Sequence, residues 1–371
     1  MKKAQRTSFL DHFMRIIGVI FSFALILASV AGKIDPRDSK YIPFFGLAYP
    51  YLLMINAAMI VWWLFTKKWY MACTSLLVIL IGWQAFNASF GFFGNKGIGP
   101  KTDTGAIRMM TYNVHSFRPY GEEVIETVKE QMLDLIEGEH PDIICFQEFF
   151  TRYKGPYNIT DSLKQSLKIR NVFFVPISQN EYEANGLAIF SRYPIINKGQ
   201  IDFREHRNGN TCIWVDIQTP TKVIRVYNVH LQSIAFDKQD YNYLDKIKNK
   251  MDPELSSSKR ILSMLKLAFR KRSEQVDYMQ ASMRNCRIPY IIAGDFNDTP
   301  ASYAVTKLTS YLNNSFVKEG TGFGRTYNGK FPNFQIDYIS TTQNIDILNH
   351  NVIEAKLSDH FPVRSDLKLK P

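Results

Sequence analysis

Three long uncharged stretches occupy the first 94 residues, and they constrain the fold more than any other feature of the chain. They are Ile16–Gly32, with 17 residues, and Pro43–Phe65 and Met71–Phe93, with 23 residues each. A helix needs ~20 apolar residues to cross the ~30 Å hydrocarbon core of a bilayer, with ~17 near the lower limit. Three tryptophans and a tyrosine lie between positions 62 and 70, as aromatic residues do at membrane interfaces. The sequence therefore predicts a membrane anchor of three transmembrane helices over residues 1–94.

A cleaved signal peptide is the alternative interpretation of the first stretch. Lys2, Lys3 and Arg6 precede it, and Ser29-Val30-Ala31 provides small residues like those of a cleavage site. Basic residues near the ends of the stretches number six on the N-terminal side and five on the other, and most of the bias precedes the first helix. Both interpretations place everything after Gly94 outside the cytoplasm. We therefore expect a multi-pass protein of the inner membrane with an extracytoplasmic, periplasmic C-terminal domain.

The remainder of the chain has the pattern of an α/β domain. Residues 95–105 are rich in Gly, Pro and polar residues and predict a linker, which leaves residues 106–371 as a separate domain. Strands are expected at Ile107–Asn113, Ile143–Glu148, Leu187–Ser191, Thr211–Thr219 and Lys222–Leu231, a further strand in the apolar run that opens Tyr290–Pro300, and a helix at Val124–Gly138. A tight turn at 219–221 joins two of these strands as a hairpin, which argues against a purely parallel sheet. We predict a layered α/β sandwich of two mixed β-sheets flanked by helices.

Polar residues that can bind metals or transfer protons follow the apolar strands at their ends. Apolar or small residues lead into Gly294, and Asp295 and Asn297 then lie on one side of the chain because strand side chains alternate. Similar groups end five other segments: Asn113 with His115, Glu148, Asn228 with His230, Asp337, and Asp359 with His360. Any one of them could be a turn cap or a surface charge. Six together indicate a shared site at one edge of the fold.

The ordered set of motifs YNVH, QE, NVHL, GDFND, IDYI and SDH resembles the endonuclease/exonuclease/phosphatase family of metal-dependent phosphodiesterases. The resemblance spans roughly Ala106 to Leu369 and leaves the apolar stretches uncovered. It implies that Glu148 is the principal ligand of Mg²⁺ (or Mn²⁺), with Asp359 contributing, because Mg²⁺ binds through one or two carboxylates plus waters and substrate phosphate. Asp295 would orient and deprotonate the attacking water, and Asn297 and Asn113 would position it.

The same resemblance assigns the histidines. His230 and His360 would donate to phosphoryl oxygens and stabilise the charge that develops in the transition state. Asp337 would hold the tautomer of His360, as the third member of a triad does. The family uses water directly, so no covalent nucleophile is expected. His115 and Asn228 remain open candidates for supporting roles.

Composition indicates which class of partner the protein binds. The net charge of +11, from 45 basic and 34 acidic residues, suits anionic partners, and four cysteines without a CxxC spacing argue against a disulfide framework or a zinc site. Within a long insertion at Asp237–Arg287, the basic stretch Ser258–Arg287 carries apolar residues at helical spacing. It could lie on a membrane or pack on the domain with a solvated basic face.

These features leave three hypotheses for function. The first is a membrane-anchored, metal-dependent phosphoesterase that acts at the lipid bilayer on lipid head groups or small phosphodiesters. The second is an extracytoplasmic nuclease of low specificity, for which the basic surface would contact nucleic acid. The third, a non-catalytic binding module, is disfavoured by the complete set of polar residues.

Overall fold

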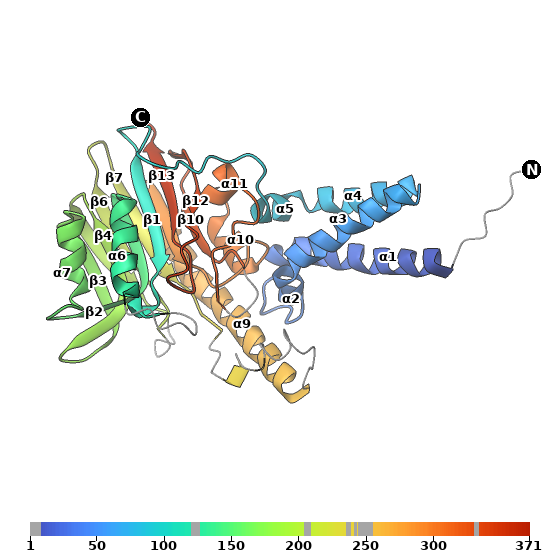
Figure 1. Ribbon diagram of the computed structural model, residues 1–371, viewed down its shortest axis with the longest axis horizontal. Helices are drawn as coiled ribbons and strands as arrows, with labels where there is room; N and C mark the ends of the chain where they lie inside the picture. Colours follow the sequence, from blue (N-terminus) through green and yellow to red (C-terminus); the bar gives the residue numbers. More distant parts are fainter. Residues whose placement is uncertain are drawn as a thin grey trace, which may run out of the picture.

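The computed structural model shows a β-sandwich domain with a helical arm that projects from one side (Figure 1). It describes residues 9–119, 127–203, 209–234, 239–240, 243, 255–329 and 334–371. The predicted helix start at Val124 and the first part of the insertion, from Asp237 to residue 254 apart from positions 239, 240 and 243, lie outside these residues.

The first sheet has seven strands in the order β11-β13-β1-β2-β4-β3, with β12 paired to β13 beside this path. β1 is parallel to β2 and antiparallel to β13, so the sheet is mixed as predicted. The strands are β1 (Ile107–Asn113), β2 (Ile143–Arg152), β3 (Asn171–Gln179), β4 (Glu183–Ser191), β11 (Ile345–Ile347), β12 (Asn351–Val352) and β13 (Val363–Leu369).

The second sheet has six strands in the order β5-β6-β7-β8-β10-β9. β7 and β8 are parallel, and the predicted hairpin is present as the antiparallel pair β6 and β7. The strands are β5 (Ile195–Ile201), β6 (Thr211–Gln218), β7 (Val223–His230), β8 (Tyr290–Asp295), β9 (Asn313–Asn314) and β10 (Asp337–Thr341).

Three buried apolar layers hold the sandwich together. One lies between the two sheets, and the other two lie under helices on the outer faces. The helices α6 (Val128–Gly138) and α7 (Ile159–Ser166) cover the first sheet, and α9 (Leu255–Asn285) and α10 (Tyr303–Thr309) cover the second (Figure 1). The short elements η2 (His115–Phe117) and α11 (Ser315–Glu319) follow β1 and β9. This arrangement confirms the predicted α/β sandwich.

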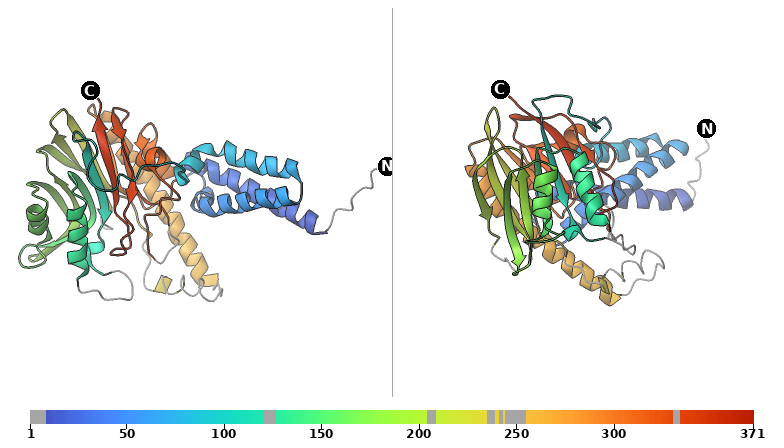
Figure 2. Two further views of the ribbon diagram at one scale, coloured as in Figure 1. Left: turned by 45° about the horizontal axis from the view of Figure 1, so that its top comes forward. Right: turned by 60° about the vertical axis from the view of Figure 1, so that its left-hand side comes forward.

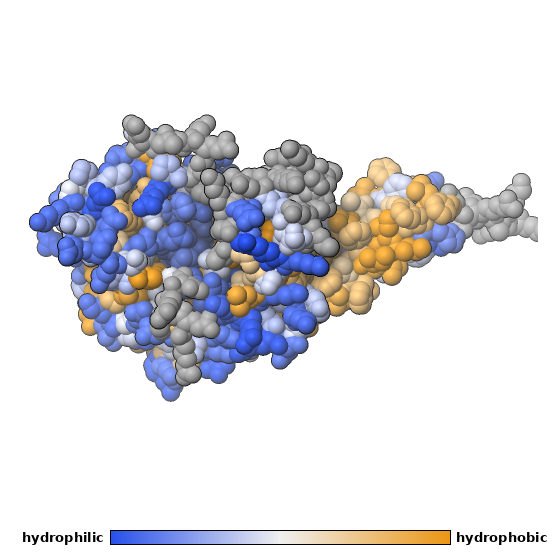
Figure 3. All heavy atoms as spheres, turned by 90° about the horizontal axis from the view of Figure 1, so that it is seen from below, coloured by the Kyte–Doolittle hydropathy of each residue, from blue (hydrophilic) through white to orange (hydrophobic). Residues whose placement is uncertain are grey.

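The helical arm, residues 9–89, extends away from the sandwich (Figure 2). It comprises α1 (Phe9–Val30), η1 (Ala31–Lys33), α2 (Ile42–Leu47), α3 (Tyr49–Phe65), α4 (Trp69–Ile81) and α5 (Trp83–Ser89). Apolar side chains cover its surface (Figure 3), among them Phe9, Phe23, Phe65 and Ile81, each more than half exposed. A soluble protein seldom exposes an apolar surface of this extent.

The prediction of three transmembrane helices is wrong in number. Among the described residues, one helix, beginning at Phe9, is long and apolar enough to cross a membrane by itself. The second stretch is divided at Ala48, between α2 and α3, with Pro50 in the first turn of α3, and α3 itself has 17 residues. The third stretch bends by 75° between α4 and α5. Hydropathy does not register such changes of direction, which proline and glycine introduce without any charge.

This correction also removes the basis for the predicted topology. Three crossings were needed to place the C-terminal domain outside the cytoplasm, and the helices found do not support a multi-pass arrangement or a periplasmic domain. A single N-terminal apolar helix is compatible with a membrane anchor and with a signal sequence.

The arm is packed against the sandwich through α2 and the loop before it. Thr299 Oγ1 donates to the Gly46 carbonyl at 3.4 Å, and Ser273 Oγ of α9 donates to Asp35 at 2.6 Å. Arg37 forms an ion pair with Asp277 at 2.7 Å. α2 therefore rests on α9 and on the loop that follows β8.

The basic stretch predicted at Ser258–Arg287 forms helix α9, and most of its apolar residues are buried against the protein, although Leu262 and Leu267 are 44% and 55% exposed. Ile261, Leu265 and Phe269 pack toward α2, and Val276 and Met279 pack on the second sheet. The second of the two interpretations of this stretch, a helix packed on the domain, is therefore the correct one.

The predicted linker at 95–105 lies along the surface of the sandwich. Arg364 donates to the Lys96 carbonyl at 2.9 Å, and Arg108 donates to the Gly99 carbonyl at 3.0 Å. The division of the chain at this segment stays a prediction.

Candidate active site

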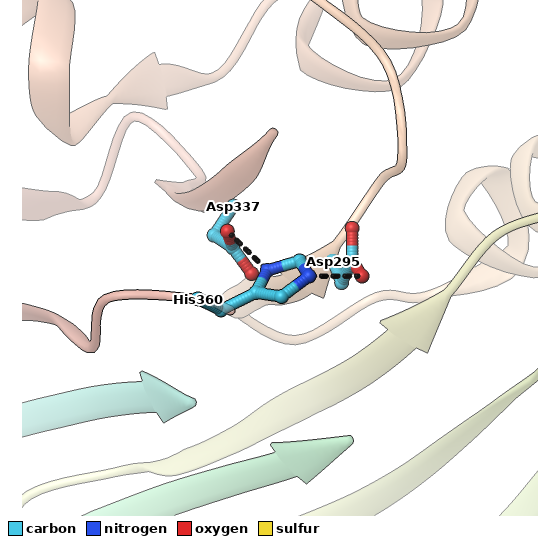
Figure 4. Close-up of side chains that lie close together, drawn as sticks. All are labelled: Asp295, Asp337 and His360. Carbon is cyan, nitrogen blue, oxygen red and sulfur yellow. Dashed lines mark hydrogen bonds and ion pairs between the residues drawn. The ribbon is translucent and has the colours of Figure 1, made fainter. Parts of the chain in front are cut away.

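Eight of the polar residues predicted from the strand ends line one pocket of about 260 Å³, called the polar pocket below. They are Asn113, His115, Glu148, His230, Asp295, Asn297, Asp359 and His360. Asp337 is adjacent to the pocket and contacts His360 (Figure 4). The fold thus brings together residues that are up to 247 positions apart, from Asn113 to His360.

Glu148 reaches the polar pocket because β2 bulges at this point. The pairing of β2 with β4 shifts register between Phe146 and Phe149, and Glu148 has a φ of 51°. A bulge re-aims the side chain that it carries. The Glu148 carboxylate is 37% exposed and lies 3.6 Å from His115 Nδ1, while the Asp359 carboxylate lies 3.7 Å from the same nitrogen. Two carboxylates therefore face one imidazole at the mouth of the pocket.

Asp295 is held in place by the register of the second sheet. Its partner on β7 is His230 and its partner on β10 is Asp337, so three functional side chains lie in one row across the sheet. Gly294 makes this row possible: its φ is 141°, and a Cβ there would lie 2.0 Å from the Val229 carbonyl oxygen. Only glycine tolerates that conformation and that close approach.

A buried chain of interactions connects two aspartates through His360 (Figure 4). His360 Nδ1 lies 2.9 Å from Asp337 Oδ2, and His360 Nε2 lies 3.7 Å from Asp295 Oδ2. His230 Nε2 is 3.6 Å from the same oxygen of Asp295. The Asp337 contact fixes the ring, so that Nε2 faces the polar pocket.

Burial and charge set the protonation states. Burial, together with the nearby Asp337, raises the pKa of Asp295 to about 6, although His360 and His230 oppose the rise. Burial disfavours protonation of His360, but Asp337 and Asp295 outweigh it and hold the His360 pKa well above its usual value. Burial also opposes ionisation of Glu148, yet hydrogen bonding to His115 and the neighbouring histidines lower the Glu148 pKa to about 2. At neutral pH the pocket therefore contains a protonated imidazole between carboxylates.

Asn113, through its side-chain amide, and Asn297, through its backbone N–H, orient the carboxylates of the pocket. Asn113 Nδ2 donates to Asp295 at 3.1 Å and is 3.4 Å from Glu148. The backbone N–H of Asn297 donates to Asp295 Oδ1 at 2.8 Å. His115, Glu148 and Asn297 all have left-handed backbone conformations, with φ of 43°, 51° and 52°. Such conformations cost ~1–3 kcal/mol each for residues other than glycine and cluster at functional sites.

Asn228 lies elsewhere. It is fully buried between the sheets, where it accepts from Gln147 at 2.6 Å and donates to the Phe146 and Ala188 carbonyls. These bonds connect the two sheets, so Asn228 has a structural role and does not line the polar pocket. His115, the other open candidate, lies inside the pocket.

The polar pocket also has an apolar wall that the sequence analysis missed. It is lined by Leu47 of the arm, Ile234, Leu265 and Phe269 of α9, Phe334 and Ile336. Arg272 and Asp298 form a buried ion pair at 2.9 Å beside it. The basic residues of α9 gave a general signal in the sequence, but nothing there indicated that Arg272 would be the one that turns inward or that the arm would reach the site.

Two groups of side chains could hold a cation. Asp295, Asp337 and His360 present ligand atoms within 4.8 Å of one another, but the Asp337–His360 hydrogen bond already occupies this group. Glu148 and Asp359 offer partly exposed carboxylate oxygens, which are the donors that Mg²⁺ prefers. The second pair therefore fits a hard divalent cation better.

Comparison with known proteins defines the family. The family model described as "Endonuclease/Exonuclease/phosphatase family" matches residues 110–360, more than half of the chain. The chain belongs to the endonuclease/exonuclease/phosphatase family. Members of this family are metal-dependent hydrolases of phosphate esters, and the chain is such an enzyme. Another model, a domain of unknown function named DUF8431, matches residues 11–89, which is nearly all of the arm. No curated protein matches the sequence well enough to count as a relative.

Solved structures share the fold. An endonuclease/exonuclease/phosphatase family protein from Leptotrichia buccalis has a TM-score of 0.50 at 15% identity, covering 71% of this chain and 100% of its own. The endonuclease/exonuclease/phosphatase from Bacteroides vulgatus has a TM-score of 0.50 at 17% identity, covering 71% and 99%. TDP2 of D. rerio, humanized by 14 mutations, has a TM-score of 0.50 at 13% identity, covering 71% and 100%. At these identities the likeness concerns the family fold alone.

Proposed function

We propose that the protein is a Mg²⁺- or Mn²⁺-dependent phosphodiesterase that uses direct attack by water and works on phosphate esters at a membrane surface. The observation that carries this proposal is the polar pocket itself. It places two partly exposed carboxylates opposite a buried Asp337–His360–Asp295 chain.

In this proposal Glu148 and Asp359 hold the cation. Glu148 is anionic at neutral pH because its pKa lies at about 2. The cation, when bound, would neutralise negative charge on the phosphate oxygens. His115, 3.6 and 3.7 Å from the two carboxylates, would keep them oriented.

Asp295 would accept the proton of the attacking water. Its raised pKa, about 6, makes it a stronger base than an exposed aspartate while leaving it largely ionised at pH 7. Asn113 and the backbone of Asn297 fix both of its oxygens, so the carboxylate keeps one direction toward the water.

His360 and His230 would donate to the phosphoryl oxygens. Asp337 holds His360 with Nε2 toward the pocket, which is the arrangement that a preorganised donor requires. Donors fixed in this way stabilise the transition state more than the ground state, because no reorganisation is needed when charge develops.

The helical arm supports a membrane surface as the site of action. Its exposed apolar side chains would be buried in a bilayer, with α1 as the helix long enough to span it. Leu47 of α2 lines the polar pocket, so the arm brings the pocket close to the bilayer. Lipid head groups and small phosphodiesters are the substrates that fit this location.

A nuclease is the second candidate, favoured by the charge of α9. Lys259, Lys266, Arg270 and Lys271 give this helix an excess of basic residues, and basic surfaces bind the phosphates of nucleic acids. The experiment described next distinguishes a phosphodiesterase that acts on lipids from a nuclease.

The test uses the full chain, purified in detergent. Hydrolysis of bis(4-nitrophenyl) phosphate, phospholipid vesicles, plasmid DNA and RNA is measured with Mg²⁺, with Mn²⁺ and with excess chelator. We expect metal-dependent hydrolysis of the first two, and a loss of at least ~10²-fold for Glu148→Ala and for Asp295→Asn. Asp346→Asn, at an exposed carboxylate of β11, is the matched control. Full activity in excess chelator would contradict the proposal, and hydrolysis of DNA or RNA with none of phospholipid would favour the nuclease.

A further inference from the structure

A second cavity, of about 230 Å³, lies where the arm meets the sandwich. The arm contributes Tyr51 and Met54 from α3 and Ser89 from the end of α5, and the sandwich contributes Phe323 and Phe334. The lining is mainly apolar. Its volume is below the ~300 Å³ of typical sites for whole drug-sized ligands, so it suits one segment of a longer molecule.

The second cavity and the polar pocket share a thin wall. Phe334 lines both, and Thr299 lines the polar pocket while the next residue, Pro300, lines the second cavity. The Tyr51 ring meets the Phe334 ring edge-on, with centroids 6.1 Å apart. A molecule with its phosphate in the polar pocket would therefore enter the second cavity past Phe334.

Unpartnered polar groups lie among the apolar residues of the second cavity. Gln335 is 3% exposed, and neither its Nε2 nor its Oε1 has a hydrogen-bond partner among the described residues. Ser89 Oγ is also buried and, within the same part of the chain, has no partner. Buried polar atoms are normally paired, because leaving one unpaired is costly. Both residues line the second cavity, and a rotation of either side chain would offer these groups to a ligand that carries an amide or ester group.

The cavity also lies beside the apolar surface of the arm. Tyr51 and Met54 are 42% and 47% exposed, and α3 continues from them as an apolar helix to Phe65. An acyl chain held along this helix would reach the cavity without crossing water.

We propose that the second cavity binds the acyl-chain segment of an amphiphilic substrate whose phosphate lies in the polar pocket. Gln335 and Ser89 hydrogen-bond the amide or ester that joins the chain to the head group, and Tyr51, Met54 and Phe334 contact the first methylene groups. The substrate class is a membrane lipid with a phosphodiester head group. This inference rests on the proposed phosphodiesterase function and specifies its substrate.

The test compares three chromogenic diesters that share one scissile bond: methyl 4-nitrophenyl phosphate, hexadecyl 4-nitrophenyl phosphate, and 2-(hexadecanoylamino)ethyl 4-nitrophenyl phosphate. The full chain is assayed in mixed micelles with Mg²⁺ or Mn²⁺. We expect kcat/KM to be at least ~10-fold higher for both long-chain esters than for the methyl ester, as for an apolar site that accepts a few methylene groups.

Variants then test whether the preference for long-chain esters arises in the second cavity. Met54→Trp, which fills the cavity, is expected to lower kcat/KM ~10-fold for the long-chain esters and to leave the methyl ester unchanged. Met54→Ala introduces a smaller side chain that cannot block the cavity. It should lower the ratio of kcat/KM for the long-chain esters to kcat/KM for the methyl ester ~3-fold, because contacts with the chain are lost. Gln335→Leu should lower kcat/KM only for the amide-containing ester. Leu64→Trp, at an exposed position of α3 outside the cavity, is the matched control.

The outcomes separate the two proposals. If the wild-type protein hydrolyses none of the three esters, the phosphodiesterase function fails and the lipid site fails with it. If the methyl ester is hydrolysed but the long-chain esters are not preferred, only the lipid site is overturned. It is also overturned if Met54→Trp affects all three esters alike, or if Leu64→Trp has the same effect as Met54→Trp.

Discussion

Replacing Asp337 by Asn tests whether His360 is oriented by its buried carboxylate partner. The two side chains are almost fully buried and their atoms lie 2.9 Å apart. A hydrogen bond to a charged group contributes ~1.5–3 kcal/mol, and ~1.4 kcal/mol corresponds to a tenfold change in rate. Asp337→Asn keeps the shape of the side chain and an acceptor for His360, but it replaces the charged hydrogen bond by a neutral one, which contributes ~0.5–1.5 kcal/mol. The difference of ~1–1.5 kcal/mol predicts that kcat falls ~5- to 15-fold.

The same variant should change the pH profile in a defined direction. His360 acts in its protonated form, so activity is lost as the pH rises through the pKa of His360. Burial lowers that pKa and Asp337 raises it, so removing the charge moves the alkaline limb to lower pH. Asp337 also raises the pKa of Asp295, which lies at about 6. The acid limb, where Asp295 becomes protonated, should therefore move to lower pH as well.

A double-mutant cycle completes the test. His360→Ala should lower kcat ~10²- to 10³-fold, as for loss of one preorganised donor. Because residues that act as a unit are not additive, the double variant should be close to His360→Ala alone. The assay is steady-state hydrolysis of bis(4-nitrophenyl) phosphate from pH 5 to 10, with thermal unfolding as the folding control. If the two losses multiply, or if the alkaline limb of Asp337→Asn does not move, Asp337 does not orient His360.

Three further predictions concern stability, each measured by denaturant unfolding. Gly294→Ala places a Cβ 2.0 Å from the Val229 carbonyl oxygen, so it should cost more than ~3 kcal/mol, the upper range for one strained residue; a loss below ~1 kcal/mol would contradict this. Burial lowers the pKa of His350 to about 4, so the protein should lose about 3 kcal/mol as the pH falls from 6.5 to 4, and His350→Asn should lack this contribution. Arg272→Met leaves the buried carboxylate of Asp298 without its ion-pair partner and should cost ~3–5 kcal/mol, and adding Asp298→Asn should recover much of the loss; no recovery would mean that packing around Arg272 matters more than charge.

The strands that carry the site could be predicted because an apolar run that ends in polar residues is a local signal. The hairpin expected at 211–219 and 222–231 appears as β6 and β7, and the apolar run that opens Tyr290–Pro300 forms β8. The strand expected at Ile143–Glu148 continues to Arg152, because a bulge interrupts pairing without ending the strand. Strand β3 was not predicted: it is half-buried and contains Pro176, and a proline inside a run argues against a strand.

The arrangement of the arm could not be predicted from composition. Uniformly apolar sequence has the same hydropathy in one long helix and in two helices at an angle, so the 75° bend between α4 and α5 left no signal. The contact of Leu47 with the polar pocket depends on tertiary packing of α2 against α9. The polar residues that line the pocket were selected from the sequence by order and type, and their roles stay a prediction, whereas Arg272, Asp298 and the apolar wall became visible only in three dimensions.

The left-handed backbone at His115, Glu148 and Asn297 places selection for stability in conflict with selection for activity. Glycine adopts such conformations freely, at an entropic cost of ~0.5–1 kcal/mol, whereas each strained residue costs ~1–3 kcal/mol. Glycine at any of these three positions would therefore relieve backbone strain while removing the imidazole, carboxylate or amide that the pocket uses. Laboratory evolution that selects this protein for heat resistance alone would erode the polar pocket first at these positions. A library screened for heat resistance and hydrolysis together would retain them.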